Sequence, residues 1–363
     1  MNPIYTRELS RWLGTDHADR TPPLALVDAV KQVSDGLIKE RQLVGTAYLN
    51  TQLLREAYQT FWWPMTYLHA ATVLGHAVEL EDGAKVLDLG AGGGSCSAAA
   101  LDLANRNGVS IHLTALDHAS DALKALQELL RPRLNGSTLN TSTLDLEFMD
   151  STEQFDLILL GHVLNELFTH DPNRDQLLVD FVDSVLKRLK PNGKLVIIEP
   201  ALKETSRTLH RVRDQVIASG ASVVAPCTYQ GPCPALQDND WCHTSLSWEP
   251  PVYIQKISNL SGIDRTRLAF SYLVLTQTPQ KRDAYRIVSE PLHTKGRLRY
   301  LACGPEGRLP LVAPESRVKG ENEVFRRLPP GDLIEFGEGQ EKGDGLDISK
   351  TWVRRVGSQD EPL

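Results

Sequence analysis

The run VLDLGAGGGSCSAAA, residues 86–100, decides the fold of this 363-residue chain. It holds Asp88, Gly90, Gly92 and Gly94 in the pattern D-x-G-x-G-x-G, directly after an apolar run typical of a buried strand and directly before a helical stretch. Glycines let the backbone turn tightly and approach a ligand closely, and the amides at the start of the next helix favour a negatively charged partner. The run therefore predicts a nucleotide site at a strand–loop–helix junction.

Two acids indicate which nucleotide fits this loop. A carboxylate at Asp88 would repel phosphate, but it can accept a hydrogen bond from an ammonium group. Asp117 ends the next apolar run, 25 residues after Gly92, where a carboxylate can accept both ribose hydroxyls. We therefore expect S-adenosylmethionine to bind at Asp88, Gly90, Gly92, Gly94 and Asp117. A dinucleotide site and a vestigial loop are the alternatives.

The pattern of apolar runs around this loop predicts an α/β fold. Short apolar runs alternate with helical stretches between about residues 84 and 200, and they read KVLDLG, IHLTALD, FDLILLG and GKLVIIEP. Such runs are typical of strands buried on both faces of a parallel sheet. The intervening helices are expected at 95–107, 120–130 and about 175–189. This is the pattern of a Rossmann-like class I methyltransferase sheet.

Four parts are expected along the chain. Residues 1–80 space their apolar residues by three and four, which predicts a helical N-terminal extension. The Rossmann-like domain should cover 81–220, with strands to about 280. A cysteine-rich, partly β module should follow over 221–336. The glycine-rich, charged residues 337–363 are expected to form a flexible tail.

Composition limits the classes of function. The chain is 41% hydrophobic and lacks the long apolar run of a membrane span. Its first residues lack the pattern of a signal peptide, so we expect a cytoplasmic protein, and we expect a monomer. The net charge is −7, yet residues 201–330 hold 18 Lys and Arg against 12 Asp and Glu. A localised surface for a polyanion is compatible with this distribution.

Candidate catalytic residues follow the strands predicted at FDLILLG and GKLVIIEP, at the end of the sheet where open α/β folds hold their ligands. Glu166 or His162 could act as a base, and Asn165 could orient an amine. Alternatively, Asn165 and Glu166 cap the helix that they begin. Asp150 is expected either near the adenine or in a solvated turn, and Glu199 either touches substrate or braces a loop.

Four of the five cysteines fall in the later module: Cys227, Cys233, Cys242 and Cys303. Four thiolates suit either tetrahedral zinc or an iron–sulfur cluster. Free buried cysteines are the alternative. Cys96, at the loop-to-helix junction, is expected to be a small buried filler.

The motifs APC, GPCP and DWCH, after a strand that ends in EP and an arginine-bearing helix, resemble the Rsm-type family of methyltransferase-like proteins of the mitochondrial small ribosomal subunit, which has bacterial members. GHVLNEL is similar to the family's fourth-strand motif. The resemblance covers roughly residues 40–330. It implies an S-adenosylmethionine-binding domain, a 4Fe–4S cluster held by Cys227, Cys233, Cys242 and Cys303, and a role in small-subunit assembly or rRNA modification.

Basic residues near the cysteines agree with an RNA partner, although surface solvation also explains them. Lys295, Arg297 and Arg299 alternate, so they would share one face of a strand. Arg207 and Arg211 would share a helix face. The leading hypothesis is a methyltransferase, or methyltransferase-like assembly factor, that acts on the small ribosomal subunit or its rRNA. A non-catalytic RNA-binding factor and a small-molecule or protein methyltransferase with structural zinc are the alternatives.

Overall fold

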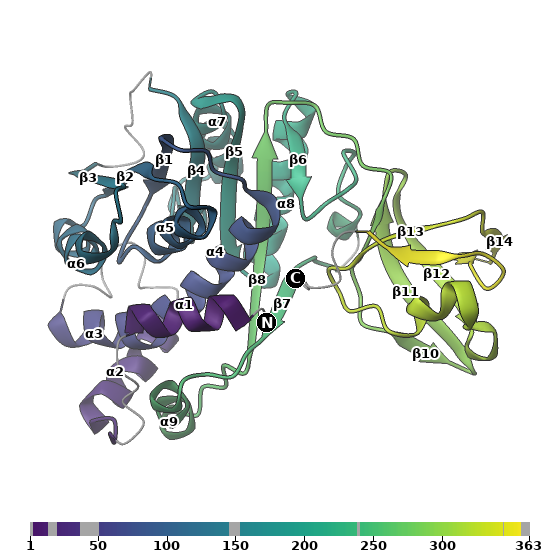
Figure 1. Ribbon diagram of the computed structural model, residues 1–363, viewed down its shortest axis with the longest axis horizontal. Coiled ribbons are helices and arrows are strands. Elements are labelled where there is room, and N and C mark those ends of the chain that lie inside the picture. Colours follow the sequence, from purple (N-terminus) through teal and green to yellow (C-terminus); the bar gives the residue numbers. More distant parts are fainter. Residues whose placement is uncertain are drawn as a thin grey trace.

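The computed structural model describes residues 3–13, 20–36, 51–144, 153–237, 240–343 and 345–356. An α/β part that carries the N-terminal helices lies beside a smaller β part, and the long strand β8 runs along the side of the α/β part that faces it (Figure 1). No helix among the described residues is long and apolar enough to cross a membrane.

The larger sheet has eight strands in the described residues, and its main path runs β3-β2-β1-β4-β5-β8-β6. Strands β1 to β5 are mutually parallel, whereas β8 is antiparallel to both of its neighbours in this path, and β7 also pairs with it. This order, with one antiparallel strand near the edge, confirms the Rossmann-like class I methyltransferase fold. The strands are β1 (Ala84–Leu89), β2 (Ile111–Asp117), β3 (Thr138–Thr143), β4 (Phe155–Gly161), β5 (Leu189–Pro200), β6 (Ser222–Ala225), β7 (Thr244–Ser247) and β8 (Arg267–Thr276).

Helices cover both faces of this sheet because successive side chains of a strand point to opposite faces and are apolar on both. In β1, Val86 belongs to the core under one face, whereas Leu87 and Leu89 belong to the core under the other. The first core takes in helices α1 (Pro3–Leu13), α2 (Leu24–Ser34), α3 (Gln52–Phe61), α4 (Trp63–Ala77), α5 (Ser95–Asn107), α6 (Ser120–Leu130) and α9 (Val252–Ser261). The second core takes in α7 (Arg174–Leu186) and α8 (Lys203–Ala218).

Buried polar contacts join the N-terminal helices to the Rossmann-like domain. The carboxylate of Asp102 in α5 accepts hydrogen bonds from Trp12 Nε1 at 2.5 Å and from the Tyr67 hydroxyl at 2.6 Å. Helix α4 is buried on nearly every side, because 13 of its 15 residues are buried. The helical extension is thus an integral layer over α5.

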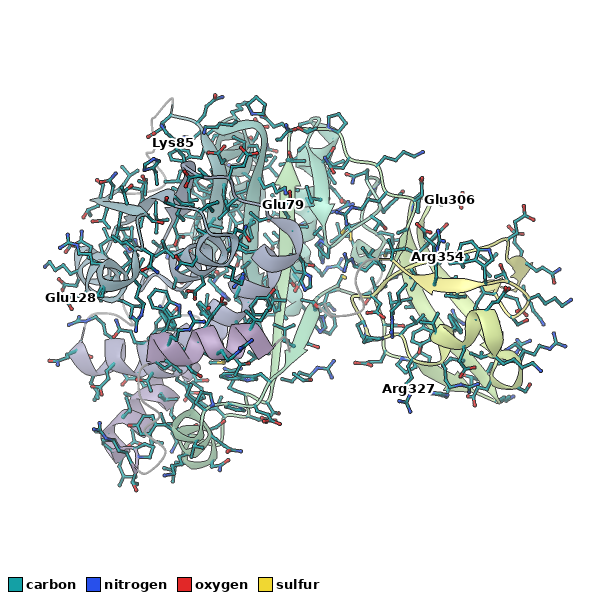
Figure 2. All side chains as sticks on the ribbon, in the orientation of Figure 1. Glu79, Lys85, Glu128, Glu306, Arg327 and Arg354 are labelled. Carbon is teal, nitrogen blue, oxygen red and sulfur yellow. The ribbon has the colours of Figure 1, made fainter. Side chains whose placement is uncertain are left out.

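The β part is a second sheet with the path β14-β15-β12-β11-β9-β13-β16, to which β10 adds through β11. Its strands surround a small core that includes Tyr300, Phe325 and Ile334. They are β9 (Tyr285–Ile287), β10 (Leu292–Thr294), β11 (Arg297–Gly304), β12 (Gly307–Pro314), β13 (Leu333–Phe336), β14 (Gln340–Lys342), β15 (Gly345–Asp347) and β16 (Val353–Arg355). Charged side chains such as Arg327 and Arg354 lie on its outer surface, and Lys85 and Glu128 lie on that of the α/β part (Figure 2).

Three local expectations differ from the structure. The helix expected over 175–189 ends at Leu186, and β5 begins at Leu189, because Leu189 pairs with Phe155 of β4. Between the second and third apolar runs the structure adds β3, a polar edge strand that no apolar run in the sequence indicates. Residues 340–355, expected in a flexible tail, supply strands β14, β15 and β16 of the second sheet.

Candidate functional site

The glycine loop between β1 and α5 has the backbone that its sequence predicts. Gly90, Gly92 and Gly94 all have positive φ angles, of 69°, 49° and 81°. A Cβ at Gly94 would lie 2.8 Å from Cγ of Leu126, so α6 packs directly on the loop there. At Gly92 a Cβ would meet no atom within 4 Å. The loop is therefore closed against α6 at Gly94 and open at Gly92, where a ligand can approach the backbone.

Asp117 fastens this loop from the end of β2. Its Oδ2 accepts a hydrogen bond from the Gly92 N–H at 2.8 Å, and its Oδ1 accepts one from the Ala119 N–H at 2.8 Å. A carboxylate has about four acceptor positions, so two are left for a ligand. The expected ribose-binding acid thus stands at the loop, where it also orders Gly92.

Asp88 lies beneath the loop and is fully buried. Its Oδ2 accepts a hydrogen bond from the Ser97 hydroxyl at 2.6 Å, whereas its Oδ1 has no partner. Burial raises the pKa of Asp88 to about 7, although the Ser97 contacts oppose the rise. The unpartnered oxygen can accept a hydrogen bond from an ammonium group, such as that of S-adenosylmethionine.

Trp63 supplies a contact that the sequence did not reveal. Its indole Nε1 donates to the Gly93 carbonyl at 2.9 Å, and its ring stacks on Tyr67 with a centroid separation of 5.5 Å. Helix α4 therefore contacts the glycine loop at Gly93, the residue after the one that Asp117 holds.

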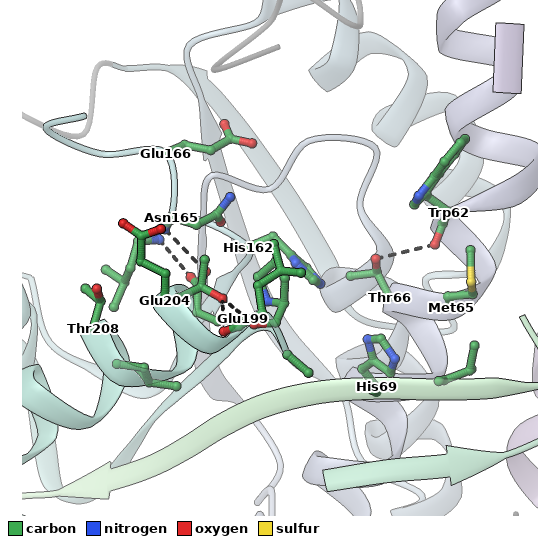
Figure 3. Close-up of a pocket in the computed structure, with 18 of the residues that line it drawn as sticks. Trp62, Met65, Thr66, His69, His162, Asn165, Glu166, Glu199, Glu204 and Thr208 are labelled. Atoms are coloured by element: carbon green, nitrogen blue, oxygen red, sulfur yellow. Dashed lines mark hydrogen bonds between the residues drawn. The ribbon is translucent and has the colours of Figure 1, made fainter. Parts of the chain in front are cut away.

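A pocket of about 580 Å³ lies at the carboxyl ends of β4 and β5, between α4 and α8 (Figure 3). Trp62, Met65 and His69 come to it from α3–α4, and Glu199 comes from β5. Because β4 pairs with β1, this pocket lies on the sheet edge that also carries the glycine loop.

The predicted catalytic residues Asn165 and Glu166 both line the pocket. They lie in a turn and begin no helix, because α7 starts only at Arg174. With its amide nitrogen turned towards its neighbours, Asn165 donates to Glu199 Oε2 and to the His162 carbonyl, each at 2.9 Å. The expected capping role is therefore replaced by bracing of the turn. The other candidate acid, Asp150, lies outside the described residues.

Glu199 is the residue that holds this turn. Its carboxyl oxygens accept the backbone N–H groups of Leu164 at 2.8 Å and Asn165 at 3.2 Å. Burial raises the pKa of Glu199 to about 8, against the effect of these hydrogen bonds. Of the two roles considered for Glu199, the structure therefore favours bracing of the loop.

The four late cysteines line one cavity of about 340 Å³ where the two parts of the molecule meet. Cys227 follows β6, Cys233 precedes a short 3-10 turn, Cys242 precedes β7, and Cys303 lies in β11. Among the described residues, no three His, Cys, Asp or Glu side chains are grouped as the ligands of a single metal ion. The four cysteines therefore share the lining of one cavity.

The pKa values of these thiols are raised by burial and by the charges of their neighbours. Burial raises the pKa of Cys233 to about 11 and that of Cys303 to about 12, and the nearby Cys227 raises both further. Burial raises the pKa of Cys242 as well, again with a contribution from Cys227. Cys96 lies apart from this cavity, buried against Gly161, in agreement with the filler role.

Two arginines of α8 donate hydrogen bonds to backbone carbonyls of the cysteine-bearing loop between β6 and β7. Arg213, which is fully buried, donates to the carbonyls of Tyr229 and Gly231. Arg207 donates to the carbonyls of Asp240 at 2.6 Å and Leu236 at 2.9 Å. Arg207 is therefore occupied inside the protein, which removes it from the proposed RNA surface.

The basic strand only partly matches its prediction. Leu298 and Tyr300 of β11 are buried, so Arg297 and Arg299 point to the opposite face, as expected. Lys295 instead lies in the turn between β10 and β11, with a positive φ of 48°. Arg211, the other expected RNA contact, pairs with Asp175 at 2.7 Å.

The model of the family described as mitochondrial small ribosomal subunit Rsm22 matches residues 56–326. The chain belongs to this family. The match spans the whole of the larger sheet, strands β9 to β12 of the second sheet and all four late cysteines. No curated protein matches the chain at a significant level.

Solved structures with a related fold are distant. A TehB-like S-adenosylmethionine-dependent methyltransferase from Corynebacterium glutamicum is 15% identical, with 62% of this chain and 98% of that chain covered and a TM-score of 0.36. The mitomycin 7-O-methyltransferase MmcR is 18% identical, with 70% and 66% covered and a TM-score of 0.39. YcgJ from Bacillus subtilis is 12% identical, with 58% and 100% covered and a TM-score of 0.35. With such scores, none of these likenesses enters the argument about function.

Proposed function

We propose that this Rsm22-family chain binds S-adenosylmethionine and methylates the rRNA of the small ribosomal subunit during its assembly. The observation that carries the proposal is the glycine loop itself. It is open at Gly92, braced by Asp117, and underlain by the unpartnered Oδ1 of Asp88. Bound S-adenosylmethionine would supply an electrophilic methyl group.

The chain's own residues would position the two reactants. Methyl transfer is an in-line displacement, so placing the acceptor correctly accounts for most of the catalysis. Gly92 and Asp117 would hold the donor, while the pocket along β4 and β5 would hold the acceptor. Asn165 and Glu166 stay the proposed catalytic pair. Asn165 would shape the turn, and Glu166 would take a proton from the acceptor where one must leave.

We further propose that Cys227, Cys233, Cys242 and Cys303 hold a 4Fe–4S cluster in the cysteine cavity. A four-iron cluster is larger than one ion and keeps its ligands further apart than tetrahedral zinc does. A cavity of about 340 Å³ lined by four thiols leaves space for such a cluster. The buried guanidinium of Arg213 would offset part of the negative charge that four thiolates bring.

The family description names the mitochondrial small ribosomal subunit, which supports an rRNA of that subunit as the substrate. Arg297 and Lys295 on the exposed side of the β10–β11 hairpin would contact rRNA phosphates. The cluster would then fix this hairpin to the methyltransferase-like domain through Cys303. The cytoplasmic location and the monomeric state stay predictions.

Donor binding is tested by calorimetry with S-adenosylmethionine on the wild type and on Gly92→Leu. The larger side chain should abolish binding, because it fills the open space at the loop. Gly108→Leu is the matched control, since Gly108 also has a positive φ, of 69°, with no atom near its Cβ, but caps the far end of α5. Equal affinities in the two variants would remove the donor from this loop.

Turnover is tested with isotope-labelled donor and purified small-subunit rRNA, either naked or in assembling particles. Label should enter the rRNA with wild-type protein and should be lost with Gly92→Leu. Co-sedimentation with the subunit in the absence of labelling would instead support a non-catalytic assembly factor.

A further inference from the structure

The pocket at the ends of β4 and β5 contains two histidines whose ring nitrogens lack partners. Both nitrogens of His69 and the Nε2 of His162 are buried and make no hydrogen bond. Both side chains line the pocket, and their ring centroids are 6.3 Å apart (Figure 3). Buried polar groups nearly always have a partner, because an unsatisfied one destabilises the protein. These nitrogens can therefore form hydrogen bonds with a ligand in the pocket.

Both rings are also held in place. His69 stacks on Phe270 of β8 with a centroid separation of 4.2 Å. His162 has a φ of 60°, a conformation that costs energy for any residue other than glycine, and its N–H donates to the Ile198 carbonyl at 2.7 Å. Backbone strain of this kind collects at functional sites. The two rings thus form a fixed pair across the floor of the pocket.

The rings present both donors and acceptors. Burial lowers the pKa of His162 to about 4 and that of His69 well below its ordinary value, so both are neutral near pH 7. A neutral imidazole offers one N–H donor and one acceptor nitrogen. The pair therefore matches a flat ligand whose edge carries donors and acceptors side by side.

Other walls of the pocket agree with a flat, nitrogen-rich ligand. Trp62 and Met65 lie on one side, and the carboxyl-bearing residues Glu199 and Glu204 lie on the other (Figure 3). An indole and a thioether pack well on planar rings, and the carboxylate of Glu204 can accept a hydrogen bond from an exocyclic amine, whereas Glu199 braces the turn. The Nε of Arg265, a further pocket residue, is also buried without a partner.

We propose that this pocket receives a single unstacked nucleobase, whose edge is hydrogen-bonded by His69 and His162. The inference rests on the proposed function and names the acceptor class at that site. An enzyme that modifies a base must take it out of the stack and read its edge in a closed pocket. A volume of about 580 Å³ holds one base with its ribose. His69 and His162 are then specificity residues that contact the substrate.

The test uses the four ribonucleoside 5′-monophosphates as probes, in calorimetric titrations of the full chain saturated with S-adenosylhomocysteine. The saturating product prevents the probes from entering the donor loop. At least one nucleotide should bind to the wild type, and His69→Phe and His162→Asn should each weaken that binding tenfold or more. Asparagine is chosen at position 162 because it tolerates a positive φ.

Thermal stability separates recognition from a structural role. His69→Phe removes two unpartnered buried nitrogens, so its melting temperature should equal or exceed that of the wild type while nucleotide binding falls. His112→Phe, at an exposed position of β2, is the control and should leave nucleotide binding unchanged. A lowered melting temperature with unchanged nucleotide affinity in His69→Phe would overturn the inference.

Failure of this inference is distinguishable from failure of the proposed function. Binding of S-adenosylhomocysteine and co-sedimentation with the small subunit are measured first. If both occur but no nucleotide binds at millimolar concentration, the nucleobase pocket is refuted and the proposed function stands. If an arginine-, lysine- or glutamine-containing peptide binds in place of the nucleotides and loses affinity in His69→Phe, the acceptor is a protein and the inference is likewise refuted.

Discussion

The contact between Trp63 and the Gly93 carbonyl predicts that an N-terminal helix tunes donor affinity. Trp63→Phe keeps a ring in the aromatic cluster but deletes the indole N–H that donates at 2.9 Å. A neutral hydrogen bond contributes about 0.5–1.5 kcal/mol net, so the affinity for S-adenosylmethionine should fall by about 2- to 12-fold. The loop would still form, because Asp117 continues to hold Gly92.

Trp12→Phe is the matched control for this substitution. The Trp12 ring lies 6.2 Å from that of Trp63, and both side chains are buried, so the two changes delete the same atoms from one cluster. The Trp12 indole, however, donates to Asp102 and not to the glycine loop. Its loss should lower the free energy of unfolding by about 1.5–3 kcal/mol, the range for hydrogen bonds to charged groups, without weakening donor binding.

Calorimetric titration and urea unfolding of both variants decide between the two roles. The reasoning predicts that donor affinity falls in Trp63→Phe alone, whereas stability falls in both. If the two variants lose donor affinity equally, the contact with Gly93 has no specific effect on the loop, and α4 acts only through general packing.

Three further predictions concern pH, RNA and metal. The folded-state pKa of His162 is about 4, below the unfolded value near 6.5, so protonation of His162 destabilises the folded protein as the pH drops through this window. In urea unfolding, the wild type should lose up to about 3 kcal/mol more of its free energy of unfolding between pH 6.5 and 4 than His162→Asn, which lacks the titrating group. Neutralising Lys295 or Arg297 should weaken rRNA binding across sequences and lower the slope of log affinity against log salt by about one unit, and unchanged salt dependence would mean that these residues are merely solvated. Cys303→Ser should lose iron, sulfide and rRNA binding while donor binding persists, whereas Cys96→Ser should keep its metal; wild-type iron in Cys303→Ser would refute the four-ligand assignment.

Local patterns predicted the conformation of the glycine loop because most of its determinants are close in sequence. Gly90, Gly92 and Gly94 need particular φ angles whatever surrounds them, and Asp117 follows a strand whose place beside β1 is set by the α/β pattern. The contact from Trp63 depends on how α4 packs across α5. No local pattern in the sequence encodes that packing.

The acceptor pocket was only half predictable for the same reason. His162 stands in the motif after β4 and was noticed, but His69 lies in a helix far along the chain and was missed. A signal was present, since WPMTYLHAATVLGHA is apolar on all sides, and such a helix must be buried together with any histidine that it carries. The edge strand β3 was missed because Thr138–Thr143 is polar, as an exposed edge allows.

The order of strands around β8 has a consequence for how the chain matures during synthesis. β6 pairs with β8 and not with β5, so the segment that carries Cys227 has no place in the sheet until residues 267–276 have left the ribosome. Three of the four cysteines have by then left the ribosome, while Cys303 has still to emerge with β11. The cysteine cavity, which Arg308, Pro330 and Gly331 also line, is therefore completed after all strands of the larger sheet have emerged. Translation order would make loading of this cavity a checkpoint, because a chain that fails there keeps a formed donor site but leaves its β part without a fixed attachment.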